Sequence, residues 1–122
     1  MSEPNFILLY VKNAPASAAF YSELLTRAPV QSSPGFVMFA LDSGLRLGLW
    51  SAETVEPAPM PAGGGELAFE VADAAAVRAT HGEWQHRGLP ILQAPTRMSF
   101  GDTFVAGDPD GHRLRVFAPL AG

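Results

Sequence analysis

The most informative segment of this sequence is DPDGHRLRVF, at Asp108–Phe117. Asp-Pro-Asp-Gly is a strong turn signal, because Pro presets φ, Gly accepts a positive φ, and Asp side chains bond to nearby backbone groups. The turn joins two predicted strands, Thr103–Gly107 before it and His112–Ala118 after it. A further strand is predicted at Ile91–Ala94. This part of the chain is therefore expected to form three consecutive strands.

A strand and a helix are predicted just upstream. Leu67–Val71 is a short apolar run typical of a strand. Asp73 can cap a helix over Ala74–Arg87, since its carboxylate can accept hydrogen bonds from the unpaired N–H groups of the first turn. Gly88 suits the left-handed residue that follows a helix end. The second half of the chain therefore has the order strand, helix, strand, strand, strand.

The first half repeats this pattern. Phe6–Val11 is a continuous apolar run that predicts a buried strand, and a helix is predicted over Ala14–Thr26. Strands are predicted at Phe36–Leu41 and Leu45–Trp50, on either side of an Asp-Ser-Gly turn. At an offset of 60 residues, the helix cap Asn13 falls on the cap Asp73. The halves are joined by residues 52–65, a Pro- and Gly-rich segment with the composition of a linker.

Composition excludes several classes of function. The chain has 122 residues, a net charge of −4 and a single lysine, Lys12, so it lacks the basic patch that nucleic-acid binding needs. It has no cysteine, which rules out disulfides, thiol nucleophiles and Cys-ligated zinc. The start, MSEPNFILLYV, has too short an apolar run for a signal peptide or a membrane span. We expect a cytoplasmic protein with neither nucleic acid nor membrane as a partner.

Several short motifs together resemble the glyoxalase, bleomycin-resistance and extradiol-dioxygenase group, the vicinal oxygen chelate superfamily. They are the Tyr10–Asn13 turn with its following helix, the Leu-x-x-Trp at Leu47–Trp50, the Phe-Gly-x-Thr-Phe at Phe100–Phe104, and Asp108–Val116. Within that superfamily the sequence is most similar to small phenazine-antibiotic resistance proteins. The resemblance implies a single α+β domain, 1–122. It would contain two βαβββ modules, 5–51 and 66–119, that curve a mixed sheet around a concave cavity.

The resemblance also implies where a metal would be held. Metal-using members take ligands from the first and last strands of each module. Phe6 corresponds to the first of these positions, Trp50 lies at or near the second, Glu66 corresponds to the third and Arg115 to the fourth. Phe and Trp offer no lone pair to a metal, and Arg is a permanent cation. A catalytic zinc usually needs three protein ligands, and one carboxylate cannot replace them. We therefore expect no metal and no other cofactor.

Alternation along the strands predicts which side chains line the cavity. The predicted ligand-binding residues are Trp50, Arg115, Phe6, Glu66, Gly48, Phe104 and Arg46. Trp50 would stack on a planar ligand beside open space left by Gly48, and Arg115 would hold a carboxylate.

Plainer roles remain open for several of these residues. Trp50 and Phe104 could be core or dimer-interface aromatics, and Phe6 could be strand core. Arg115 could form an internal ion pair with Glu66. Arg46 could be solvated at the end of its strand.

These residues favour a protein that binds a small aromatic, anionic natural product without a metal. A chain of 122 residues that opens a cavity needs extra buried surface, so we expect a homodimer, as the resemblance also implies. The resemblance further implies that the ligand is a phenazine-type antibiotic, whose sequestration gives resistance. The alternative is a metal-free lyase or isomerase that uses Glu66 as a general base. A regulatory or accessory domain is a third possibility.

Overall fold

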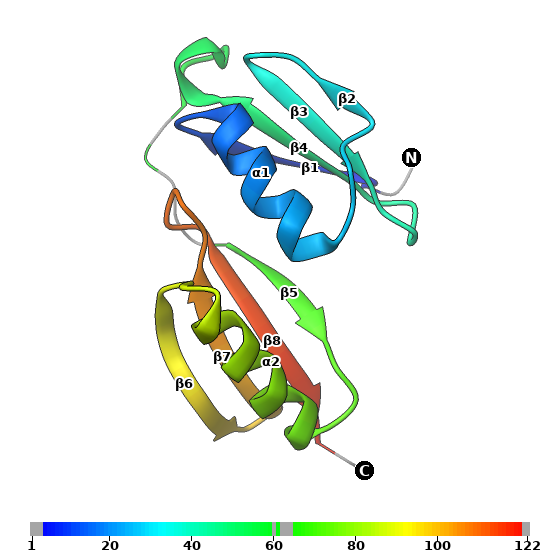
Figure 1. The fold of residues 1–122 in the computed structure, drawn as a ribbon, viewed down its shortest axis with the longest axis vertical. Coiled ribbons are helices and arrows are strands. Elements are labelled where there is room, and N and C mark those ends of the chain that lie inside the picture. The colour runs from blue at the N-terminus through cyan, green and yellow to red at the C-terminus, as the bar shows by residue number, and fades with distance from the viewer. Residues whose placement is uncertain (1–3, 60, 62–64, 121–122) are drawn as a thin grey trace. The chain divides into compact units, whose positions relative to one another are not determined.

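Each half of the chain folds into one helix that lies across a four-stranded sheet (Figure 1). The structure is a computed structural model, and it describes residues 4–59, 61 and 65–120. The chain divides into two compact units, unit 1 at Met1–Pro61 and unit 2 at Ala62–Gly122. The predicted α+β class and the two βαβββ modules are confirmed.

Unit 1 has the strand order β1-β4-β3-β2, with β1 parallel to β4 and the other neighbours antiparallel. Its elements are β1 (Phe6–Val11), α1 (Ala14–Leu25), β2 (Gln31–Ser32), β3 (Phe36–Ala40), β4 (Arg46–Ser51) and a short 3₁₀ helix, η1 (Ala52–Thr54).

Unit 2 has the same topology, β5-β8-β7-β6, with β5 parallel to β8. Its elements are β5 (Glu66–Glu70), α2 (Ala74–His86), β6 (Ile91–Met98), β7 (Gly101–Gly107) and β8 (Arg113–Pro119).

The caps predicted from the sequence start both helices. Asn13 Oδ1 accepts a hydrogen bond from the Ala16 N–H at 2.9 Å, and Asp73 Oδ1 accepts one from the Ala76 N–H at 2.8 Å. After α2, Gly88 has a φ of +87°, the left-handed conformation expected for it. The helix ends therefore lie within a residue of the predicted bounds.

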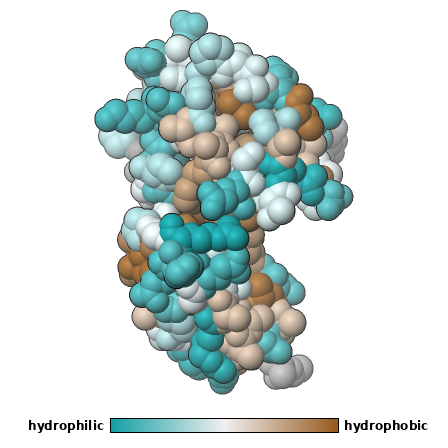
Figure 2. Space-filling view, viewed as in Figure 1, coloured by the Kyte–Doolittle hydropathy of each residue, from teal (hydrophilic) through white to brown (hydrophobic). Residues whose placement is uncertain are grey.

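One face of each sheet packs against its helix and forms the core of that unit. In unit 1 the fully buried side chains include Tyr21 of α1 and Phe39 and Leu49 of the sheet. In unit 2, Trp84 of α2 packs edge-on against Phe104, with ring centroids 5.4 Å apart. The outer surface around α2 is mainly hydrophilic (Figure 2). The opposite face of each sheet, which no helix of its own unit covers, is called the helix-free face below.

Three details differ from the sequence-based prediction. The strand at Phe6–Val11 was expected to be buried, but β1 is an edge strand, and its Phe6, Leu8 and Tyr10 are 38%, 44% and 41% exposed. The two-residue strand β2 was not predicted. The predicted linker, 52–65, begins with the helical turn η1, and its residues 60 and 62–64 lie outside the described part of the chain.

Candidate functional site

Strand register shows which positions of the two units are equivalent. In unit 1, β1 and β4 align Phe6 with Arg46 and Leu8 with Gly48. In unit 2, β5 and β8 align Glu66 with Arg113 and Ala68 with Arg115. Since Phe6 and Glu66 are equivalent, the equivalent of Arg115 is Gly48.

Trp50 lies near this position but does not occupy it. Trp50 aligns with Tyr10, and in unit 2 the matching pair is Phe117 with Glu70. Trp50 is thus equivalent to Phe117 and lies two residues beyond the equivalent of Arg115. Alternation keeps it on the same helix-free face as Gly48.

Arg115 lies at the centre of a polar cluster on the helix-free face of unit 2. Its Nε donates to Glu66 Oε1 at 2.5 Å, and its Nη2 donates to Glu66 Oε2 at 3.3 Å. Its Nη1 donates to Thr103 Oγ1 at 3.1 Å and to Gln93 Oε1 at 3.4 Å. The internal ion pair with Glu66 that the sequence left open is confirmed. Four neighbouring strands thus supply one polar cluster, the Arg115 cluster (Arg115, Glu66, Thr103 and Gln93).

Aromatic rings lie beside this cluster. The Arg115 guanidinium carbon is 5.8 Å from the centroid of the Phe100 ring, within range of a cation–π contact. Phe100 in turn packs edge-on against Phe117, with centroids 6.3 Å apart. Phe100 is 42% exposed, so its ring offers a planar surface to a ligand.

Phe104 does not belong to this surface, and its placement among the cavity-lining residues is corrected. It is fully buried on the opposite side of the sheet, where it packs against Trp84 and His81 of α2. Thr103, its neighbour in β7, occupies the helix-free face instead. The His81 and Phe104 rings are arranged edge-on, with centroids 5.3 Å apart.

The helix-free face of unit 1 is apolar. A Cβ atom at Gly48 would lie 2.7 Å from Leu8 Cδ2, 2.9 Å from Phe6 Cε1 and 3.0 Å from Phe36 Cε1. The open space expected beside Gly48 is therefore filled by these three side chains. A larger residue at this position would displace these side chains.

Trp50 and Arg46 lie on either side of Gly48 along β4. Trp50 is half-buried and packs edge-on against Tyr10, with ring centroids 6.3 Å apart. Arg46 is exposed at the start of the strand, in agreement with the solvated alternative. Unit 1 thus presents aromatic rings on this face, with a charge at its edge.

The residues at the family's metal positions do not fit a metal. Phe6, Gly48 and Arg115 have no lone pair to donate, and both oxygens of Glu66 accept hydrogen bonds from Arg115. Within residues 4–59, 61 and 65–120, no three His, Asp or Glu side chains are grouped so that they could hold an ion. The absence of a bound metal from the protein itself stays a prediction.

Residues 4–116 match the Glyoxalase/Bleomycin resistance protein/Dioxygenase superfamily. The chain belongs to this superfamily. The predicted resemblance is thereby confirmed. Among the described residues, no helix has the length and apolarity needed to cross a bilayer.

Three known proteins align with nearly the whole chain. The phenazine antibiotic resistance protein EhpR of Enterobacter agglomerans is 29% identical over 116 residues, which cover 93% of this chain and 89% of EhpR. Protein ATC0852 from Agrobacterium tumefaciens, solved in solution, is 52% identical in sequence to this chain. The match covers 99% of this chain and 100% of ATC0852, with a TM-score of 0.91. A glyoxalase-related enzyme from Fulvimarina pelagi shares the fold at 22% identity, with a TM-score of 0.83 over 97% of this chain and 88% of its own.

Four residues of the helix-free face of unit 2 were absent from the predicted ligand-binding residues. Thr103 and Gln93 bind Arg115, and Phe100 and Phe117 lie next to it. The alternation of β8 placed Phe117 on the correct face, but the partners from β6 and β7 depend on register across three strands. The register shifts between Ile91 and Thr96 hide that alignment from the sequence.

Proposed function

We propose that this protein binds a small aromatic molecule without a metal, and that sequestering a phenazine-type antibiotic in this way gives resistance. The similarity to a phenazine antibiotic resistance protein, over nearly the full length of both chains, supports the choice of ligand. The chemistry of the helix-free faces supports the absence of metal and the aromatic character of the ligand.

The arrangement of Arg115, Glu66 and Phe100 supports this proposal most directly. The position that would hold a metal ligand in a metal-using relative is occupied by a cation paired with a carboxylate. An exposed aromatic ring lies against the same cation. A planar ligand can stack on Phe100 and form a hydrogen bond to the polar pair, which is the usual composition of a small-molecule site.

Unit 1 offers a second aromatic surface, and the proposal includes it. Trp50 and Phe6 lie on the helix-free face of that unit and are both partly exposed. Offset stacking on a Trp ring adds about 0.5–1.5 kcal/mol to the burial of apolar area.

Binding fits the geometry better than catalysis by Glu66. A general base must accept a proton from its substrate, but both oxygens of Glu66 accept hydrogen bonds from Arg115. The pairing leaves this carboxylate less available to a substrate proton than an unpaired one would be. Turnover of a bound ligand that Glu66→Gln abolishes would support the enzyme instead.

Calorimetric titration of a phenazine into the purified protein tests the proposal. We expect one saturable site per chain. Phe100→Ala should lower affinity by about 5- to 150-fold, equivalent to the ~1–3 kcal/mol of lost stacking and burial. Val30→Ala is the control, because Val30 is 61% exposed in the loop before β2 and should not affect binding. Absence of saturable heat with any phenazine would contradict the proposal.

A further inference from the structure

We infer that the Arg115 cluster selects an aromatic ligand with a neutral hydrogen-bond acceptor over one with a carboxylate. The inference rests on the proposed function and names its ligand class more closely. It departs from the anionic ligand expected from the sequence, where Arg115 was treated as a cation available to a ligand. Two observations support it: the charge of Arg115 is compensated, and nearly all of its donors are used.

The charge of Arg115 is compensated by Glu66. Nε and Nη2 both donate to the Glu66 carboxylate, so the two charges are joined by parallel hydrogen bonds. The side chains are only 18% and 31% exposed, so solvent weakens the pairing less than at the surface. A ligand carboxylate at this guanidinium would be a second anion beside Glu66, and like charges at that spacing repel.

The donors of Arg115 are also nearly exhausted. A guanidinium has five N–H groups. Among the described residues, two of them donate to Glu66, one to Thr103 and one to Gln93. The remaining N–H is on Nη2. One free donor suits a single acceptor, such as a carbonyl oxygen or an aromatic ring nitrogen. A bidentate carboxylate would require a second donor.

Thr103 holds the guanidinium in this state. Thr103 is fully buried, and its hydroxyl donates to the Val116 carbonyl oxygen at 2.8 Å. With its only hydrogen committed to the backbone, the hydroxyl can offer just lone pairs to the cluster, and Nη1 of Arg115 occupies one of them. Nη1 is therefore held by β7 while Glu66 holds the opposite edge, so Arg115 has little freedom to turn toward a ligand anion.

The test compares phenazine-1-carboxamide with phenazine-1-carboxylate at pH 7, where the acid is ionised, by calorimetry on the wild-type protein. We expect the amide to bind about tenfold or more tightly, because a like charge near Glu66 opposes the acid. Higher salt should narrow the gap, because ions screen that repulsion. Equal or tighter binding of the carboxylate would overturn the inference while leaving the proposed function intact. If neither compound bound, the proposed function would fail, and the inference with it.

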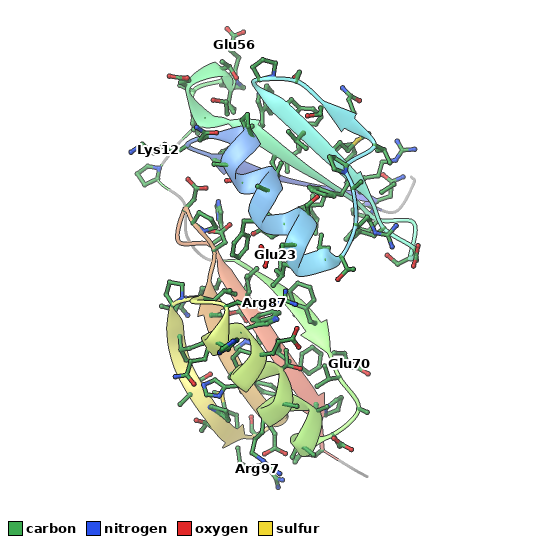
Figure 3. All side chains as sticks on the ribbon, in the orientation of Figure 1. Lys12, Glu23, Glu56, Glu70, Arg87 and Arg97 are labelled. Carbon is green, nitrogen blue, oxygen red and sulfur yellow. The ribbon has the colours of Figure 1, made fainter. Side chains whose placement is uncertain are left out.

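Glu66→Gln isolates the cause of the selectivity. Its amide can still accept from Arg115 but has no charge, so affinity for the carboxylate should rise by about tenfold while affinity for the carboxamide changes by less than about threefold. Glu70→Gln is the matched control, because it removes the same charge from the same face of β5 without touching the Arg115 cluster (Figure 3 labels Glu70). An equal change for both ligands in Glu66→Gln would contradict the inference, and so would an effect of Glu70→Gln as large as that of Glu66→Gln. The wild-type comparison decides the question even if a variant folds poorly.

Discussion

A Cβ atom at Gly101 would collide with the carbonyl oxygen of Ala118. Gly101 opens β7 opposite Pro119 and has a φ of +150°, which other residues rarely adopt. Its missing side chain is therefore what lets β7 and β8 approach at this end. The turn at the start of Asp108–Phe117 also depends on a single residue. Asp108 Oδ1 accepts hydrogen bonds from the backbone N–H groups of Asp110 and His112, as expected from the Asp-Pro-Asp-Gly turn signal.

Gly101→Ala should destabilise the protein by about 2–6 kcal/mol, since backbone strain and overpacking each cost about 1–3 kcal/mol. Gly111→Ala is a fair comparison: φ is +87° there, but no atom lies within 4 Å of the added Cβ. We expect a loss of only about 1 kcal/mol for it. Urea unfolding monitored by circular dichroism measures both, and equal losses would show that the close approach at Gly101 is unimportant.

Thr103→Val should weaken binding of a phenazine carboxamide by about 2- to 10-fold, the equivalent of one net hydrogen bond. Valine has nearly the same shape but cannot accept from Arg115. Thr103→Ser keeps the hydroxyl and should bind within about twofold of the wild type. Calorimetry on the two variants separates a positioning role from simple packing, because loss of packing alone would harm the serine variant more.

The face on which each side chain lies could be predicted from the sequence only in strands where polar and apolar residues alternate. In β8, Arg113 and Arg115 alternate with the buried Leu114 and Val116, so the sequence assigned both faces correctly. In β7 nearly every residue is buried, so alternation defines two faces without showing which one meets the helix. This is why Phe104 was placed on the wrong face and Thr103 was overlooked.

At the scale of elements, helix boundaries were predicted best because the caps are local side-chain chemistry. Strand environments were predicted less well. The apolar run of β1 suggested burial on both faces, yet the strand forms an edge of its sheet. The two residues of β2 are too few to show any alternation.

The β6–β7 hairpin is closed by an ion pair whose effect depends on pH. Arg97 and Asp102 face each other across the strands, and Arg97 is exposed near the turn (Figure 3). The hydrogen bond from Arg97 holds the pKa of Asp102 below its ordinary value. Because the folded-state pKa is depressed, the stabilisation is present above the unfolded-state pKa and is lost as pH falls through the folded-state pKa.

We expect an NMR titration of the Asp102 carboxyl carbon to give a pKa below that of an unpaired Asp. Arg97→Gln should raise the pKa toward the ordinary value, since it removes both the charge and the paired hydrogen bonds. Arg78→Gln should have a much smaller effect on the Asp102 pKa. Arg78 acts on Asp102 only through its charge, and this is the weakest of the influences on that pKa. An unchanged Asp102 pKa in Arg97→Gln would contradict this account of the hairpin.

At the scale of the whole molecule, the exposed edge strand β1 supports the predicted homodimer. Exposed apolar patches on small proteins often mark association surfaces, and β1 has neither a proline nor a charge to discourage contact along its edge. We expect sedimentation at micromolar concentration to show a dimer. Leu8→Glu should shift it toward monomer, whereas Val30→Glu, at an isolated exposed position, should not. A stable wild-type monomer would count against the prediction.

Metal-free binding of an aromatic ligand can be tested directly on the purified protein. The most direct measurement titrates phenazine-1-carboxamide into protein dialysed against a strong chelator, with metal content determined on the same sample. We predict one saturable site per chain, with the affinity unchanged by the chelator and less than about a tenth of an equivalent of metal, because one carboxylate already paired with Arg115 cannot replace the usual three ligands. Binding that disappears on chelation and returns with a stoichiometric divalent ion would contradict the account.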